Sequence, residues 1–187
     1  MSNGKQVAIV AKKTSGANEA SLLCRLRHPN IVAPIYAVKK YGLTVLVLPW
    51  LKFVLPLQYQ VAMDFAQDVL KALVYLHGHG IIHRDIKPDN VGFLHEENRW
   101  VLIDFDVAID CSEEDEGFCL ASYAGTCNFM APEVQMLMDG EDDEYSYPAD
   151  IYTLRPHARS GSCPREKVGG KVQKRVPSVD SALRPCR

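Results

Sequence analysis

The feature that most constrains this chain is the eight-residue run His83–Asn90, with the sequence HRDIKPDN. It places a carboxylate, an ammonium group and an amide at fixed offsets in one segment, at Asp85, Lys87 and Asn90. The run could be no more than a charged connection between a helix and a strand. Its residue types instead fit a loop that handles a phosphate group and a metal ion, because lysine binds phosphate and oxygen ligands bind Mg²⁺.

The segment before this run has the apolar spacing of a helix that buries one face. Its apolar residues recur at i, i+4, i+7, i+8 and i+11, and Gly78 and Gly80 follow as stop signals. The apolar positions are Phe65, Val69, Ala72, Leu73 and Leu76. We assign these side chains to the core, and we expect the helix to position the run His83–Asn90.

Two segments downstream of the run His83–Asn90 also have distinctive sequences. The apolar stretch Trp100–Ile103 has strand composition and ends in Asp104, which Phe105 and Asp106 follow. Further on, Gly125–Glu133 has the sequence GTCNFMAPE.

Three segments upstream of the run His83–Asn90 carry further sequence features. Glu19–Ile31 begins with an acid and ends in the turn sequence HPNI. Val7–Lys13 has strand composition, and a period of two places Lys13 on the same face as Ala11. Leu43–Leu51 predicts a buried strand that runs into a connecting segment.

Together these segments resemble the catalytic domain of eukaryotic-type protein Ser/Thr kinases. HRDIKPDN is similar to the catalytic loop of that family, Asp104–Asp106 to its DFG motif, and Gly125–Glu133 to the end of its activation loop. The resemblance implies an α+β, protein kinase-like two-lobe fold, with ATP and Mg²⁺ bound between the lobes. It also implies an enzyme that transfers the terminal phosphate of ATP to Ser or Thr hydroxyls of a protein substrate. Lysine at Lys87 is similar to Ser/Thr kinases rather than Tyr kinases.

The resemblance also assigns roles to single residues. Asp85 is the implied acceptor of the substrate hydroxyl proton, and Lys87 is expected against the transferred phosphate. Asn90 and Asp104 are the implied magnesium ligands. We expect His83 to be packed and hydrogen-bonded, not to shuttle a proton.

The implied ATP-binding residues lie upstream. Lys13 is the expected ATP-binding lysine, with Glu19 as the acid that clamps it, and Lys12 is the alternative. Only six positions separate Lys13 from Glu19, so the helix that carries this acid must be short or displaced. Pro49 is expected to offer its carbonyl to the adenine amine, and Leu51 its backbone N–H.

Three positions near the activation loop carry further expectations. Asp106 replaces the glycine of the DFG motif, whose missing Cβ permits backbone angles that other residues adopt only at a cost. Thr126 should lie near Asp85 and Lys87. Ser122 occupies the usual activating phosphorylation site, and an unmodified loop serine is the equal alternative.

The match predicts an incomplete kinase domain over residues 1–154, with a small lobe at about 5–48, a hinge at 49–52 and a large lobe at 53–154. We expect the glycine-rich loop to be missing, together with the helix called αF in kinases and all that follows it. Residues 155–187 hold nine Lys and Arg against two acids, a net charge of plus seven, without an apolar period. This composition predicts a basic, disordered tail that no longer encodes kinase sequence.

The cysteines and the apolar runs limit which partners and which cellular compartment we expect. The six cysteines are too scattered to predict a disulfide framework or a zinc site, which favours a reducing, intracellular compartment, cytoplasmic or nuclear. No apolar run has membrane-spanning length, so we expect no membrane partner, and we do not favour nucleic acid as a partner of the tail. The alternative to a working kinase is a catalytically inactive kinase fragment or a regulatory binding module.

Overall fold

The computed structural model describes residues 7–13, 16–53, 58–112, 119–120, 124–126, 129–136 and 144–154. Ser122, the tail 155–187 and the side chains of Lys12 and Lys13, all of which carry sequence-based expectations, lie outside the described part.

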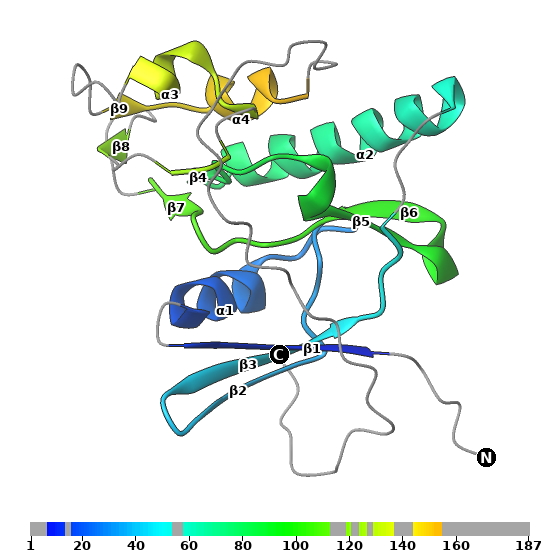
Figure 1. The fold of residues 1–187 in the computed structure, drawn as a ribbon, viewed down its shortest axis with the longest axis vertical. Coiled ribbons are helices and arrows are strands. Elements are labelled where there is room, and N and C mark those ends of the chain that lie inside the picture. The colour runs from blue at the N-terminus through cyan, green and yellow to red at the C-terminus, as the bar shows by residue number, and fades with distance from the viewer. Residues whose placement is uncertain are drawn as a thin grey trace.

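A three-stranded antiparallel sheet forms one end of the molecule, in the order β1–β3–β2 (Figure 1). Its strands are β1 (Val7–Lys13), β2 (Tyr36–Lys40) and β3 (Leu43–Pro49). The two-residue turn Tyr41–Gly42 joins β2 to β3, with φ angles of 51° and 72°. Positive φ at both positions matches the right-handed twist of the flanking strands, and glycine adopts it without strain.

Helix α1 (Gly16–Arg25) follows β1 after only two residues and packs against β2 and β3. It begins three residues before Glu19, so this acid lies in the first turn of the helix. Leu22 and Leu23 are buried, while Ser21 and Arg25 are exposed, as expected for an amphipathic helix.

The second lobe is built on the long helix α2 (Tyr59–His77). Its predicted apolar face is confirmed, because Val69, Ala72, Leu73 and Leu76 are buried, with Gly78 as the C-cap. Short antiparallel strand pairs and short helices surround α2 (Figure 1). The pairs are β4 (Ile81–Ile82) with β7 (Ile109–Asp110), β5 (Val91–Leu94) with β6 (Arg99–Leu102), and β8 (Cys119–Leu120) with β9 (Glu144–Tyr145). The helical elements are η1 (Pro88–Asn90), η2 (His95–Glu97), α3 (Pro132–Met136) and α4 (Pro148–Tyr152).

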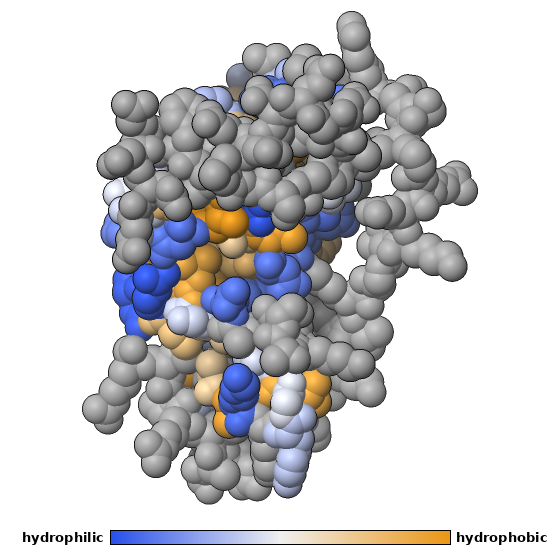
Figure 2. All heavy atoms as spheres, turned by 90° about the vertical axis from the view of Figure 1, so that its left-hand side faces the viewer, coloured by the Kyte–Doolittle hydropathy of each residue, from blue (hydrophilic) through white to orange (hydrophobic). Residues whose placement is uncertain are grey.

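One apolar core runs through both lobes. It joins Leu23 of α1 and Leu46 of β3 to Leu73 of α2 and to Leu102 and Phe105. A smaller cluster packs α3 and α4 against β4. Figure 2 shows the side of the molecule on which α1 lies, where apolar side chains reach the surface at mid-height beside polar ones. The predicted α+β, kinase-like two-lobe fold is confirmed, and the shared core fixes α1 against the large lobe.

Two further observations concern partners and cysteines. Among the described residues, no helix combines the length and the apolar character that crossing a bilayer requires. Cys111, which is 2% exposed, is disulfide-bonded, whereas Cys24 forms no disulfide bond. The scattered cysteine spacing did not predict this bond, because spacing along the chain does not show which side chains folding brings together.

Candidate active site

One buried carboxylate holds the run His83–Asn90 in place. Asp150 of α4 is 1% exposed, and it accepts hydrogen bonds from two backbone N–H groups of the run. The N–H of His83 donates to Oδ2 at 2.9 Å and that of Arg84 to Oδ1 at 2.8 Å. His77, the last residue of α2, also contacts Oδ2 through Nε2 at 3.0 Å. These bonds fix the backbone where Arg84 adopts a φ of 68°, a left-handed angle that is costly for any residue other than glycine.

Asp85 lies at the centre of a polar cluster. The ammonium group of Lys87 donates to Asp85 Oδ2 at 2.7 Å, and the hydroxyl of Thr126 donates to Oδ1 at 2.7 Å. Lys87 Nζ also donates to Thr126 Oγ1 at 2.5 Å. Asn90 is 0% exposed, and its Nδ2 donates to Asp85 Oδ2 at 2.7 Å and to the backbone oxygen of Asp85 at 2.8 Å. The predicted proximity of Thr126 to Asp85 and Lys87 is confirmed, and the loop residues Asp85, Lys87 and Asn90 lie together.

His83 is packed and hydrogen-bonded, as predicted. Its side chain is 0% exposed, and the ring meets Phe105 edge-on at 4.7 Å between centroids. Nε2 lies 3.1 Å from the backbone oxygen of Ile103, and the N–H of Asp85 donates to Nδ1 at 3.3 Å. Both contacts are satisfied by a neutral ring that carries its proton on Nε2. Burial lowers the pKa of His83, which favours the same neutral form.

This lowered pKa predicts that stability falls in acid. Between the folded-state pKa and the ordinary value of 6.5, the unfolded chain binds more protons at position 83 than the folded chain. The free energy of unfolding should therefore keep its full value above pH 6.5. It should decrease as the pH falls below this value, by up to about 1.4 kcal/mol per pH unit. Urea unfolding at a series of pH values measures this slope.

His83→Gln is the matched variant for that measurement, because it retains an amide that can donate to Ile103 but does not titrate. Burial also lowers the pKa of His28, so a part of the slope should persist in the variant. Equal slopes in the parent chain and the variant would contradict a contribution from His83.

The segment Asp104–Asp106 lies between the run His83–Asn90 and α1. Phe105 is 1% exposed, and its backbone N–H donates to Glu19 Oε1 at 3.1 Å. Asp104 adopts a φ of 68°, whereas Asp106 is not among the described residues with positive φ. The expected backbone cost of an aspartate in place of glycine is therefore absent in this conformation, and the left-handed position is Asp104 instead.

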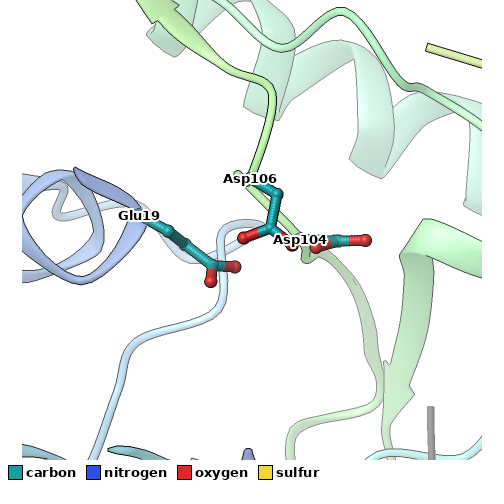
Figure 3. Close-up of side chains that lie close together, drawn as sticks. All are labelled: Glu19, Asp104 and Asp106. Carbon is teal, nitrogen blue, oxygen red and sulfur yellow. The ribbon is translucent and has the colours of Figure 1, made fainter. Parts of the chain in front are cut away.

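Three carboxylates come together at this place. Carboxylate oxygens of Glu19, Asp104 and Asp106 all lie within 4.8 Å of one another, and Figure 3 shows the three side chains converging from α1 and from the segment after β6. Glu19 is 4% exposed, so part of this charge is out of contact with water. Oxygen ligands of this kind are suited to Mg²⁺, which binds carboxylates in preference to softer groups.

The predicted ATP-binding residues lie on the sheet and in the segment that leaves it. Lys13 is the last residue of β1 and pairs with Leu43 across the ladder, and Lys12 pairs with Thr44. The choice between these two lysines rests on side chains outside the described part. Pro49 ends β3 opposite Val7. Leu51 is 4% exposed and packs closely on Gly92. A Cβ added to Gly92 would lie 2.8 Å from Leu51 Cδ1.

Two cavities border the site region. One of about 10 Å³, roughly the space of a single water molecule, touches Asp85 and Thr126 together with apolar residues such as Met130 and Val134. The other, of about 720 Å³, lies between the segment after α1, the residues that follow β3 and the β5–β6 hairpin, and includes Pro49 in its wall. The smaller cavity is the one that adjoins the carboxylate of Asp85.

Two features of this site were not predicted from the sequence. The contact of His77 with Asp150 joins positions that are 73 residues apart, and no local sequence pattern predicts it. The carboxylate of Asp106 was treated only as a missing glycine. Its spacing of two from Asp104 could have suggested that both side chains lie on one side of an extended segment.

Comparison with known proteins agrees with this geometry. The family model described as "Protein kinase domain" matches residues 4–155. "Serine/threonine-protein kinase ppk25" of Schizosaccharomyces pombe is 32% identical over 148 residues, which cover 73% of this chain and 34% of that protein. "3-phosphoinositide-dependent protein kinase B" of Dictyostelium discoideum is 30% identical over 80% of this chain and 18% of its own length. "Calcium/calmodulin-dependent protein kinase type 1" of Macrobrachium nipponense is 31% identical over 68% of this chain and 39% of its own length.

The chain belongs to the protein kinase family, whose members are enzymes. The matched region spans between 18% and 39% of the length of these three relatives. The range matched by the family model, residues 4–155, contains the run His83–Asn90, the segment Asp104–Asp106 and the three-stranded sheet.

Proposed function

We propose that this chain carries the catalytic centre of an ATP-dependent protein serine/threonine kinase. The observation that supports this most is the cluster around Asp85, in which Lys87, Asn90 and Thr126 all hydrogen-bond to one carboxylate. A general base must be held in a fixed place to accept a proton from a hydroxyl, and three donors hold Asp85. In this proposal Asp85 accepts the proton of a Ser or Thr hydroxyl of a protein substrate.

The neighbouring side chains complete the proposed roles. Lys87 lies 2.7 Å from Asp85 Oδ2, so its charge is available beside the position at which negative charge develops on a transferred phosphoryl group. Thr126 limits the rotation of Asp85 by its bond to Oδ1. Lys13, Glu19, Pro49 and Leu51 are the proposed ATP-binding residues, with Lys12 as the alternative lysine.

The residues present fit Mg²⁺ by their donor chemistry. Asp104 offers carboxylate oxygens and Asn90 an amide oxygen, both hard ligands that suit this ion. Carboxylate oxygens of Asp104, Glu19 and Asp106 lie within 4.8 Å of one another, and oxygen ligands at this spacing are suited to a divalent cation. When bound, Mg-ATP supplies the phosphoryl group, and the protein contributes position and charge.

A nucleotide-binding measurement tests the metal role of Asp104. Thermal unfolding of the purified chain should shift upward with Mg-ATP, since a ligand that binds only the folded state at 100 times its Kd adds about 2.7 kcal/mol. Asp104→Ala should remove the shift that depends on Mg²⁺, while the variant without ligand should stay folded because the side chain of Asp104 is only half-buried.

Asp89→Ala is the control for this experiment, because Asp89 is an exposed acid on a different segment, the short helix η1. It should keep the full shift. A shift of parental size in Asp104→Ala would refute the metal role of Asp104. Cooperative unfolding of the parent chain without any response to Mg-ATP would instead favour the alternative, an inactive fragment or a regulatory binding module.

We also propose the division of the chain. Residues 5–48 form the small lobe, 49–52 the hinge and 53–154 the large lobe, with 155–187 as a basic tail. Strand β3 ends at Pro49 and helix α2 begins at Tyr59. These two boundaries support the placement of the hinge between the strand and the helix. Dependence on ATP favours an intracellular site of action.

A further inference from the structure

A chain of polar contacts joins α1 to the segment that follows β7. Arg25, in the last turn of α1, donates from Nη2 to Asp110 Oδ2 at 2.7 Å. The hydroxyl of Ser112 donates to the other oxygen, Oδ1, at 2.6 Å, and the N–H of Ser112 donates to the same atom at 3.2 Å. In Figure 1, β7 lies above α1, on the side of the helix that faces the large lobe. One carboxylate therefore connects a helix of the small lobe to Ser112.

The backbone of Ser112 is fixed although its side chain is exposed. The preceding residue, Cys111, donates its N–H to the oxygen of Gly80 at 2.6 Å. Gly80 has a φ of 72°, and a Cβ at this position would lie 2.7 Å from the Cα of Ser112. A rigid support therefore presents the hydroxyl at the surface.

The residues that follow Ser112 form an acidic run. Four acids come directly after it, Glu113, Glu114, Asp115 and Glu116. A protein kinase with a basic substrate groove selects such sequences by charge complementarity. Exposed Ser21, in contrast, is followed by two leucines and a cysteine.

We propose that Ser112 is a phosphorylation site for a Ser/Thr kinase that selects acidic sequences, and that the phosphate takes Arg25 as its partner. In this reaction Ser112 Oγ forms a bond to the terminal phosphorus of a nucleoside triphosphate. The bond from that phosphorus to the bridging oxygen breaks, the nucleoside diphosphate leaves, and the hydroxyl proton passes to the base of the modifying kinase. The site does not depend on the function proposed above for this chain.

Charge explains why the contact with Arg25 should strengthen. Before modification the guanidinium faces the single negative charge of Asp110, whereas a phosphoserine adds a charge of about −1.5 to −2 beside it. The phosphate also removes the hydroxyl proton that Ser112 donates to Asp110. The side chain of Arg25 is 61% exposed, so it is free to reorient and form charge-assisted bonds to phosphate oxygens. Because α1 also carries Glu19, the modification would hold Glu19 more firmly against Phe105.

The first experiment locates the modification. The full chain with Asp85→Asn, which removes the proposed activity of the chain itself, is incubated with Mg-ATP and an acid-directed Ser/Thr kinase. Mass spectrometry of proteolytic peptides should find one phosphate on Ser112 and none on Ser21, and Ser112→Ala should lose the modified peptide. Absence of phosphate from Ser112 would overturn the proposed site.

The second experiment tests the partner. Hydrogen exchange of the α1 amides should slow about threefold on phosphorylation, the size expected for a strengthened ion pair near the surface. In Arg25→Met, which keeps an apolar stem without the charge, phosphorylation should leave the exchange unchanged. Asp110→Asn gives a second variant, in which the slowing should persist because Arg25 and the phosphate both remain. Equal exchange before and after phosphorylation of the chain with Arg25 intact would overturn the partner.

Discussion

Asp85→Asn is expected to abolish phosphoryl transfer while leaving the binding of Mg-ATP nearly unchanged. Loss of a positioned general base lowers the rate by about 10²- to 10⁴-fold. The amide keeps one oxygen as an acceptor, but its nitrogen would have to face one of the donors, Lys87 or Thr126, that now contact the carboxylate. The proposed metal ligand Asp104 lies on a different segment and is unchanged. Calorimetric titration of Mg-ATP, together with phosphate incorporation into Ser- and Thr-containing peptides, measures both quantities.

The matched control is Asp89→Asn, which makes the same chemical change at an exposed position four residues away. It should leave both transfer and binding as they are in the parent chain. If Asp85→Asn lost binding and transfer to the same extent, Asp85 would have a structural role and not that of a base.

Asp150→Ala is expected to destabilise the fold severely. The backbone N–H groups of His83 and Arg84 both lose their acceptor, and His77 loses its contact. A buried donor without a partner costs about 1–3 kcal/mol, so two such groups cost about 2–6 kcal/mol. Domains are stable by only about 5–15 kcal/mol, and the loss could therefore remove cooperative unfolding. Urea unfolding followed by circular dichroism measures the change.

Asp64→Ala provides the comparison for that experiment. Asp64 accepts a hydrogen bond from Gln60 at 3.1 Å on the exposed side of α2, where water replaces the lost partner. Its removal should change the unfolding free energy by no more than about 0.5 kcal/mol. A loss of this small size in Asp150→Ala would mean that water reaches the catalytic-loop backbone and satisfies its donors.

The parts of the site that sequence predicted are those in which the partners are close along the chain. Asp85, Lys87 and Asn90 lie within six residues, so a loop of this length must bring them together. The buried face of α2 was equally predictable, because a 3.6-residue period decides which side chains share a face. Local spacing is a sufficient signal for both features.

The remaining contacts depend on packing between distant segments. Arg25 and Asp110 are 85 positions apart, and the N–H of His83 meets a carboxylate 67 positions further on. Sequence periodicity does not predict such a pairing. The pairing forms only after α1, α2 and α4 have packed around a common core. The choice between Lys12 and Lys13 as the ATP-binding lysine was open for a related reason, because the strand period selects a face of β1 but does not show which side chain extends toward α1.

Residues 26–32, which follow α1, are bonded to the large lobe, and the first bond to the sheet comes at Ile35, whose N–H donates to the oxygen of Val47. The oxygen of Asn30 accepts from the N–H of Leu102 at 2.8 Å, its side chain donates to the oxygen of Trp100 at 2.9 Å, and the N–H of Val32 donates to Leu102 at 2.9 Å. His28 stacks on Tyr75 of α2. These bonds therefore attach residues 26–32 to the large lobe, although the lobe boundary proposed above assigns them to the small lobe. If the molecule opens and closes, we expect the C-terminal end of α1 to travel as one rigid body with α2 and β6, while the three strands swing about two pivots, one after Val32 and one after Pro49.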